Sequence, residues 1–333
     1  MKIVLMPGDG IGPEQMNAAK KVLYAIKDIL SLKFELEEVE AGDQALAKYG
    51  KALPDHTLAK IEEADACLKA PIGSSASDVI VYLRRKFDLY ANLRPAKTFP
   101  NIKGLRDNID MLIVRENTED LYAGLEYELD DASIAIKVIT RKASLRIADT
   151  AFKLAMNRRK RVHAVHKANL LRKTDGLFAK CCREVAEKYD VEYNELLIDA
   201  AAMNLIRNPE EFDVIVTMNM FGDILSDEAA QVVGSLGIAP SANIGDSFAI
   251  FEPVHGSAPD IAGKGIANPI SLILSAKMMF EWLSKKDKKF LEASKMIEDA
   301  VYNTLRKGIM TPDINGSNTT DEVTDAIINE LRS

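Results

Sequence analysis

The sequence has few cysteines and no long apolar run. Its 333 residues include only Cys67, Cys181 and Cys182, which are too few and too unevenly spaced for a disulfide framework or a zinc site. No segment stays apolar over the length of a membrane-spanning helix, and the N-terminus lacks the apolar stretch of a signal peptide. We therefore expect a cytoplasmic protein that has no membrane partner.

Positive charge is also scarce. Lys and Arg number 43 and Asp and Glu number 50, so the net charge is -7. A nucleic-acid-binding protein would carry a basic footprint, and this balance argues against a nucleic-acid partner. The 47% hydrophobic content is nevertheless enough for a large core, and the length suits two domains.

Short apolar runs alternate with amphipathic segments, which predicts an α/β fold. Residues 2 to 6 indicate a buried strand, a glycine-rich turn follows at 8 to 14, and apolar residues then recur at helical spacing to Leu30. The turn has the pattern G-x-G-x-G-P-E and not the G-x-G-x-x-G of Rossmann folds, so we reject a Rossmann domain. Its glycines could serve a tight turn or a direct cofactor contact.

The rest of the chain continues this alternation. Strands are expected where β-branched and apolar residues gather, helices where apolar residues recur every three or four positions, and loops where glycine is dense. The expected strands cover 33–39, 109–114, 133–140, 162–165 and 214–216; helices follow Pro54 and cover 78–87, 145–155 and most of the chain from 269; loops cover 234–246 and 255–265.

A pair of carboxylates follows one of these strands. Residues 214 to 216 suit a strand buried on both faces, and Asn219 and Gly222 indicate a turn before a helix. On that helix Asp223 and Asp227 would lie one turn apart on the same face. Bound Mg²⁺ or Mn²⁺ would relieve the repulsion between them. The alternative is an acidic first turn that complements the helix dipole.

Other charged residues also stand at the ends of predicted strands. Arg115, Lys167 and Asp199 do so, and because open α/β sheets bind ligands at the carboxyl ends of strands, one cleft could collect them with the aspartate pair. Together with Arg115, Arg84 and Arg94 could clamp two carboxylates, since a guanidinium binds a carboxylate through two parallel hydrogen bonds. Each arginine alone could equally form a surface ion pair. The combined set indicates acid-base chemistry on a small dianionic substrate.

Six stretches carry a resemblance to a known family. They are Gly-Asp-Gly-Ile-Gly-Pro-Glu at 8–14, Asp-Leu-Tyr-Ala-Asn-Leu-Arg-Pro at 88–95, Ile-Val-Arg-Glu-Asn-Thr-Glu at 113–119, His-Lys-Ala-Asn at 166–169, Phe-Gly-Asp-Ile-Leu-Ser-Asp at 221–227 and Glu-Pro-Val-His-Gly-Ser-Ala-Pro-Asp-Ile-Ala-Gly at 252–263. In this order they resemble the β-decarboxylating dehydrogenases that act on isopropylmalate, isocitrate, homoisocitrate and related 2-hydroxy acids. The likeness runs essentially from end to end.

The resemblance implies a two-domain α/β fold of the isopropylmalate dehydrogenase type, with a cleft between the domains. The first domain would be discontinuous, built from residues 1–92 and 236–333, and would bind the cofactor. Residues 93–235 would form the domain for dimerisation and for the metal and substrate. A homodimer is implied, in which Lys167 and Asp199 reach into the cleft of the partner subunit, and dimers could pair further into tetramers.

The resemblance also implies a role for each residue of the site. The substrate carboxylates would be bound by Arg84, Arg94 and Arg115, and Mg²⁺ or Mn²⁺ by Asp223, Asp227 and Asp199 of the partner subunit. Lys167 would take the hydroxyl proton as a hydride passes to the nicotinamide, and Tyr122 would protonate the carbon after CO₂ leaves. The cofactor would be bound by His255, Gly256, Ser257, Ala258, Asp260, Ile261, Asn268 and Asp313.

Two residue types suggest the cofactor and the substrate. An acidic residue at the position of Asp260 resembles the pattern of the NAD-using members of the family. A carboxylate accepts hydrogen bonds from ribose hydroxyls and repels a 2′-phosphate. The resemblance implies that the helix turn before Arg84 faces the variable substituent, and here it carries Ile80 and Val81, which suit a branched alkyl group. The expected reaction is NAD-dependent oxidative decarboxylation of 3-isopropylmalate to 2-oxoisocaproate, a step of leucine biosynthesis. Homoisocitrate and isocitrate are the alternative substrates.

Two other classes of protein fit less well. A metal-dependent phosphotransferase would carry a P-loop or a nucleophilic aspartate directly after a strand, and the sequence has neither. A catalytically silent regulatory subunit of the same family would be expected to lose some of the acids, Lys167 or Tyr122. All of them are present.

Overall fold

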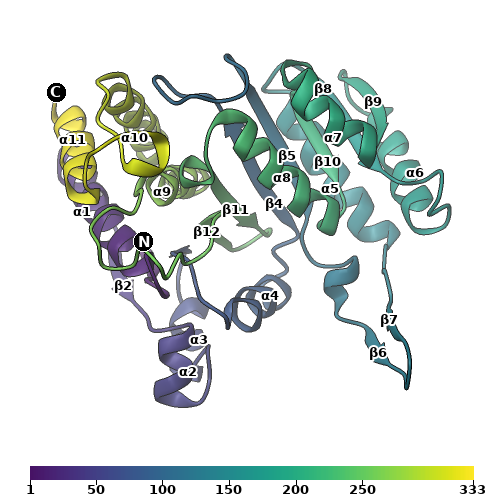
Figure 1. The fold of residues 1–333 in the computed structure, drawn as a ribbon, viewed down its shortest axis with the longest axis horizontal. Coiled ribbons are helices and arrows are strands. Elements are labelled where there is room, and N and C mark those ends of the chain that lie inside the picture. Colours follow the sequence, from purple (N-terminus) through teal and green to yellow (C-terminus); the bar gives the residue numbers. More distant parts are fainter.

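The computed structural model describes all 333 residues and is built around one ten-stranded sheet (Figure 1). Its strands are β1 (Lys2–Met6), β2 (Glu35–Glu38), β3 (Ala66–Lys69), β4 (Ala91–Lys97), β5 (Asp110–Glu116), β8 (Arg161–His166), β9 (Glu192–Leu197), β10 (Val214–Thr217), β11 (Pro240–Ile244) and β12 (Ala249–Pro253). They lie in the order β2-β1-β3-β12-β11-β4-β5-β10-β8-β9. The predicted α/β fold class is therefore confirmed.

The helices surround both halves of this sheet. The α-helices are α1 (Gly12–Leu30), α2 (Asp43–Tyr49), α3 (Asp55–Glu62), α4 (Ala76–Lys86), α5 (Arg141–Ala155), α6 (Thr174–Ala186), α7 (Ile198–Arg207), α8 (Asn219–Val233), α9 (Ile270–Leu283), α10 (Lys289–Arg306) and α11 (Thr320–Arg332). Short 3₁₀ helices are η1 (Leu121–Ala123), η2 (Pro209–Glu211), η3 (Leu236–Ile238) and η4 (Pro312–Ile314). None of the helices is long and apolar enough to cross a membrane.

The sheet has two parallel halves joined by antiparallel strands. β2, β1, β3 and β12 run parallel, and so do β5, β10, β8 and β9, whereas β11 and β4 pair antiparallel with each other and with their outer neighbours. In Figure 1 the N-terminal α1 lies beside the C-terminal α11 on one half, and α5 to α8 surround the other. The predicted domain boundaries fall within β4 and just before η3, and the division into two domains stays a prediction.

Buried apolar residues explain why these segments form these elements. β1 and β3 are buried almost throughout, as parallel strands covered on both faces must be. On α1 the buried residues include Met16, Ala19, Leu23 and Ile26, which follow the helical period seen in the sequence. The three cysteines are buried within this interior and form no disulfide.

The glycine-rich turn before α1 is a packing feature. Gly8 and Gly10 have φ angles of 64° and 60°, a region that favours glycine. A Cβ atom on Gly8 would lie 2.0 Å from the backbone oxygen of Pro71, and one on Gly10 would lie 2.0 Å from that of Ser257. These glycines therefore allow the turn to contact two other loops, which supports the tight-turn interpretation.

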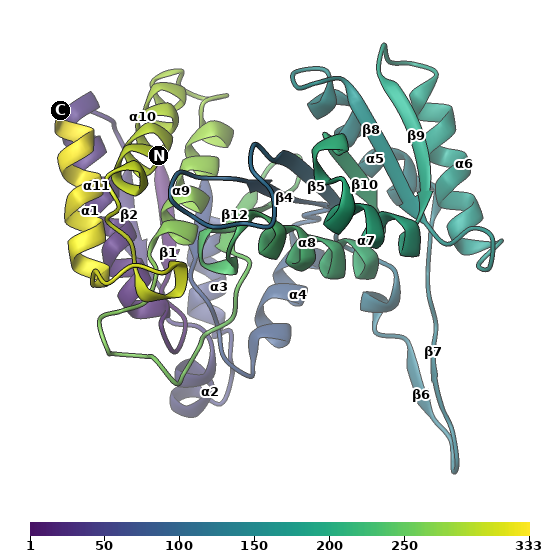
Figure 2. The ribbon, with the colours of Figure 1, turned by 45° about the horizontal axis from the view of Figure 1, so that its top comes forward.

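Three expectations about local structure were wrong. Gly222 does not precede a helix, because α8 already begins at Asn219 and includes Gly222. Residues 240–244 are not a loop but form β11 at the centre of the sheet. The strand expected over 133–140 is shorter, since only Ser133–Ala135 forms β7, which pairs with β6 (Glu126–Glu128). Figure 2 shows that this pair projects from the body as an arm.

Candidate functional site

Three arginines converge near the middle of the sheet, each from a different element. Arg84 lies on α4, Arg94 on β4 and Arg115 on β5, and all three side chains are buried. The Nη1 atoms of Arg94 and Arg115 lie 3.1 and 2.5 Å from Oδ1 of Asp223. The three arginines of the predicted clamp are therefore brought together, and none of them is a surface ion pair.

The close approach of β5 and α8 depends on Gly222. A Cβ atom at this position would lie 2.6 Å from Cγ and 2.7 Å from Cβ of Arg115. Glycine inside the helix, normally unfavourable, thus leaves room for the arginine side chain. Asp223 follows directly and is brought into contact with that arginine.

Tyr122 and both aspartates of α8 belong to the same cluster. The hydroxyl of Tyr122 donates to Oδ2 of Asp223 at 2.5 Å, and the Arg115 guanidinium lies 5.2 Å from the centre of the tyrosine ring. Asp227 lies one turn further along α8, with Oδ1 3.4 Å from Nη1 of Arg94. The spacing predicted from the sequence therefore places Asp223 and Asp227 side by side.

The charges of the cluster strongly affect one another. Burial and the neighbouring Arg94 and Arg84 lower the pKa of Arg115 to about 9. Burial opposes ionisation of Asp223, but the charges of Arg115 and Arg94 outweigh it and lower the pKa of this carboxyl group. Burial, assisted by the charge of Asp223, instead raises the pKa of Asp227. Positive charge is thus concentrated near Asp223, and the negative charge of Asp227 is less well compensated.

A second buried charge group lies behind Arg84. Glu252 on β12 accepts from Lys69 Nζ at 2.7 Å and from Arg84 Nη2 at 3.2 Å. Four buried cations, counting Lys69 with the three arginines, therefore face the three carboxylates of Glu252, Asp223 and Asp227. This arrangement suits an anionic ligand.

Lys167 and Asp199 do not join this cluster within the chain. Lys167 follows β8 and its Nζ lies 2.5 Å from Oδ1 of Asp199, which lies in the first turn of α7. Their side chains are 27% and 60% exposed, and neither contacts the arginines or the aspartates of α8. One chain therefore does not bring all these side chains into one cleft, and their entry from a partner subunit stays a prediction.

The carboxylates of one chain do not form a complete metal site. No three His, Cys, Asp or Glu side chains converge to hold an ion. Asp223 and Asp227 supply the oxygen donors that Mg²⁺ and Mn²⁺ prefer, and burial together with the charge of Asp223 raises the pKa of Asp227. A divalent cation therefore fits these two side chains if further ligands come from the substrate or another chain.

Most of the predicted cofactor residues line one open cavity of about 200 Å³. It lies where the loop after β12 meets the start of α1, and Ile11 N donates to Ser257 O at 2.9 Å. Asn268 Nδ2 donates to Asp313 Oδ2 at 3.0 Å. Asp260 is exposed and precedes Ile261, a residue of the lining. The lining contains six of the eight predicted residues, His255, Gly256, Ala258, Ile261, Asn268 and Asp313, together with Ile11, Gln15, Gly237 and Ile266, which the sequence did not indicate.

Ile80 and Val81 lie on α4 one turn before Arg84. Ile80 is buried against the apolar core around β3 and α4, and Val81 is half-buried beside the same core. The helix therefore carries two apolar side chains one turn before Arg84. No charged side chain occupies either position.

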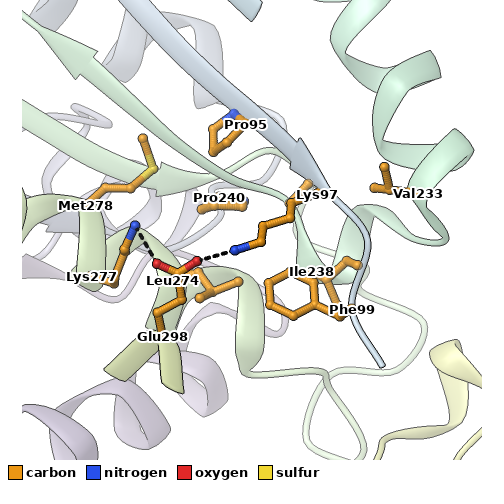
Figure 3. A pocket seen from close by; sticks show the side chains of 11 residues that line it. Pro95, Lys97, Phe99, Val233, Ile238, Pro240, Leu274, Lys277, Met278 and Glu298 are labelled. Carbon is orange, nitrogen blue, oxygen red and sulfur yellow. Dashed lines mark hydrogen bonds and ion pairs between the residues drawn. The ribbon is translucent and has the colours of Figure 1, made fainter. Parts of the chain in front are cut away.

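A more apolar cavity lies elsewhere (Figure 3). It is lined by β4, β11, α9 and α10, and Glu298 at its edge pairs with Lys97 at 2.7 Å and Lys277 at 3.1 Å. Pro95 and Lys97 line it, whereas Arg94, the residue between Leu93 and Pro95, faces the arginine cluster. Because side chains alternate along a strand, this cavity lies on the opposite face of β4 from the candidate site.

The chain is similar throughout its length to enzymes of one kind. Residues 2–327 match the model of the isocitrate/isopropylmalate dehydrogenase family. The chain is 54% identical to 3-isopropylmalate dehydrogenase of Sulfurisphaera tokodaii, covering 99% of this chain and 98% of the relative. It is 48% identical to homoisocitrate dehydrogenase of Methanocaldococcus jannaschii over 100% and 98% of the two chains. The crystal structure of isocitrate dehydrogenase from Methylococcus capsulatus matches with a TM-score of 0.93 and 42% identity over 100% and 99%.

Proposed function

The chain belongs to the isocitrate/isopropylmalate dehydrogenase family of decarboxylating dehydrogenases, and we propose that it oxidises and decarboxylates 3-isopropylmalate with NAD. The observation that carries this proposal is the cluster in which three buried arginines lie beside the partly exposed Tyr122 and Asp223. A substrate with two carboxylates matches it, because each guanidinium can donate two parallel hydrogen bonds.

Two arginines retain donors for such a substrate. Nη1 of Arg84 and Nη2 of Arg94 donate to no group of the chain, whereas the other nitrogens of both guanidinium groups do. Neither atom belongs to the buried side-chain atoms that lack a partner, so both are accessible and can donate to a ligand. The proposed substrate carboxylates would accept these hydrogen bonds.

The reaction requires a base that removes the hydroxyl proton during oxidation and an acid that protonates the carbon after CO₂ leaves. The ε-amine of Lys167 from the partner subunit, when neutral, would take the hydroxyl proton as the substrate is oxidised, and NAD would accept the hydride. After CO₂ leaves, the hydroxyl of Tyr122 would donate its proton to the carbon. Burial and Asp223 raise the pKa of Tyr122, which keeps that proton on the phenol until it is needed.

A divalent cation on Asp223 and Asp227 would polarise the oxygen of the alcohol and of the ketone. The two carboxylates would hold it, with Asp199 of the partner subunit as a further oxygen ligand. In the single chain Asp199 is exposed and contacts Lys167, so both side chains are accessible to a second subunit.

Exposed apolar side chains support a homodimer. On α7, Met203 and Ile206 follow Asp199 at helical spacing and are 65% and 54% exposed. On α8, Ile224 is 56% exposed and precedes Asp227 by three positions. Residues at such spacing share a helix face, so both apolar stripes lead to an aspartate of the proposed metal site. The projecting arm adds further exposed apolar residues, Leu125, Tyr127, Leu129, Ile134 and Ile136.

The apolar surface of α4 favours an alkyl substituent. Isocitrate and homoisocitrate carry a third carboxylate, which would lose hydration beside Ile80 and Val81 without gaining a cation. An isopropyl group would instead bury apolar surface there. Relatives named for isopropylmalate and for homoisocitrate are both close in sequence, so the substrate has to be assayed directly.

Absorbance at 340 nm tests the proposal. We expect NAD reduction to be fastest with 3-isopropylmalate and Mn²⁺, to stop with a chelator, and to be much slower with NADP because Asp260 repels a 2′-phosphate. A higher kcat/KM for isocitrate or homoisocitrate would overturn the substrate assignment. Reduction unaffected by thorough removal of metal would overturn the metal site.

A substitution on α4 sharpens the substrate test. Val81→Arg should lower kcat/KM for isopropylmalate and raise it for homoisocitrate, because it adds a cation for the third carboxylate. Tyr82→Arg is the matched control, since Tyr82 is the next residue and is 47% exposed. An equal change in both variants would show that α4 does not contact the substituent.

A further inference from the structure

The strand that the sequence did not reveal, β11, carries a completely buried asparagine. Oδ1 of Asn243 accepts hydrogen bonds from Nε of Arg84 at 2.9 Å, from Nδ2 of Asn92 at 3.1 Å and from Nδ2 of Asn117 at 2.9 Å. Its own Nδ2 donates to Oε1 of Glu252 at 2.8 Å. One small side chain therefore contacts groups on α4, β4 and β12 and the residue that follows β5.

Chemistry fixes the orientation of this amide. Nε of Arg84 can only donate, so it must face the oxygen of Asn243. On the opposite side lie only acceptors, the carboxylate of Glu252 and, at 3.3 Å, the carbonyl oxygen of Ile250. An amide satisfies both sides at once, whereas a carboxylate of the same shape would place oxygen against oxygen.

The contacts of Asn243 extend to the second substrate arginine. Nδ2 of Asn92 donates to Asn243, and Oδ1 of Asn92 accepts from Nε of Arg94 at 2.7 Å. Both arginines are thus held at Nε, directly at Arg84 and through one asparagine at Arg94. Their unpaired Nη atoms remain for a ligand.

We propose that Asn243 is a positioning residue, which fixes the relative placement of the Arg84 and Arg94 guanidinium groups so that their free Nη atoms bind one dicarboxylate together. This inference rests on the proposed function, because it assigns a substrate to those arginines. Fixed donors bind without reorganisation, so loss of the connection should weaken substrate binding more than it slows the chemical step.

Asn243→Asp is the sharpest variant because it keeps the shape of the side chain. It would place a second carboxylate against Glu252 and draw Arg84 away from its present position. We expect KM for the substrate to rise between about 10- and 100-fold, with kcat changed less than about threefold and KM for NAD unchanged.

Two further variants separate positioning from folding. Ser241→Ala is the matched control, because Ser241 is buried two residues earlier on β11 and bonds only to the backbone oxygen of Glu252. It should leave KM unchanged. Asn243→Ser, which is smaller and carries no charge, serves if the aspartate variant does not fold, and should raise KM in the same direction.

Calorimetric binding of 3-isopropylmalate keeps the inference independent of turnover. Weaker binding by folded Asn243 variants, with normal binding by Ser241→Ala, would support the proposal. It would do so even if the wild-type chain bound the compound without oxidising it, because that result would count against the proposed function alone. Wild-type affinity and KM in a folded Asn243 variant would overturn it. So would an equal loss in the Ser241 control, or no binding of the dicarboxylate by the wild-type protein.

Discussion

The residues expected to act on the substrate occupy two regions with opposite surroundings. The guanidinium groups of Arg94 and Arg115 are buried and hold Asp223, which is 36% exposed, in a hydrogen-bonded cluster. Lys167 and Asp199 form a separate ion pair that has only its own contact, with side chains 27% and 60% exposed. The buried groups have a defined position before any ligand arrives, because moving them would break several hydrogen bonds. An exposed ion pair gains little from its own contact. Within one chain the two regions therefore stay apart, and the exposed pair would gain a fixed position under a second subunit.

Asp223→Asn should give the largest effect, because it breaks the buried region at its centre. The new amide cannot accept from both Arg115 and Tyr122 as the carboxylate does, and one ligand charge for the cation is lost. We expect kcat to fall by about a thousandfold or more. Steady-state assays across a range of Mn²⁺ concentrations would measure this. Activity within tenfold of the wild type would mean that the buried cluster is not the reaction centre.

Hybrid dimers test whether the two regions serve different sites. Lys167→Met and Tyr122→Phe homodimers should each lose about two to four orders of magnitude in kcat, the usual contribution of a general acid or base. Random exchange of subunits should then restore about a quarter of the wild-type activity, since half the dimers are hybrids and each has one intact site of two. If exchange is verified by mass and no activity returns, Lys167 and Tyr122 act within one chain.

A surface substitution on α7 tests what covers the exposed region. Met203→Glu should raise the dissociation constant of the dimer by about 10- to 100-fold, because it buries a charge in an apolar contact. Specific activity should then fall on dilution, and sedimentation velocity would show monomers. Met156→Glu, at the exposed end of α5, is the control. Equal behaviour of both variants would show that α7 does not lie in the interface.

The sequence predicted the residues of the site better than it predicted β11, the strand at the centre of the sheet. Arg115, Asp223 and Tyr122 come at strand ends or within extended motifs, and the structure brings all of them together. β11 was missed because Pro240, Ser241, Ala242 and Asn243 have low β-propensity, and tertiary contacts on both sides overrode it. With the strand, the sequence reasoning also missed Asn243.

Long-range pairing explains the other gaps. Lys69 and Glu252 are 183 residues apart, and no local pattern joins them. Each stands at or near a strand end, the one signal that could have placed them in the site. Glycine is rare inside helices, so the sequence places Gly222 in a turn. In the structure, a glycine is needed here because a Cβ atom would clash with the side chain of Arg115. Contacts between distant segments, and contacts with a second chain, are the information that composition and spacing do not contain.

The smallest effect concerns acid stability, in which the two regions should also differ. Burial alone would raise the pKa of Glu252, but the charges of Lys69 and Arg84 outweigh it and lower the pKa to about 2. Because the pKa is lower in the folded protein than the usual unfolded value of about 4.3, the stabilisation is fully present above that value. It is lost as the pH falls toward 2. Protonation of this group should thus lower the free energy of unfolding by an amount on the order of 1 kcal/mol between pH 5 and 3.

Urea unfolding of Glu252→Gln measures that contribution. The variant should be less stable than the wild type at pH 7, because Lys69 is left buried without its partner, and its stability should fall less steeply between pH 5 and 3. Asp55→Asn is the control from an exposed pair, since Lys51 and Asp55 meet at 2.9 Å in solvent. It should keep the wild-type slope, because a solvated pair contributes little to the free energy of unfolding. An unchanged slope in Glu252→Gln would place the acid sensitivity outside the buried region.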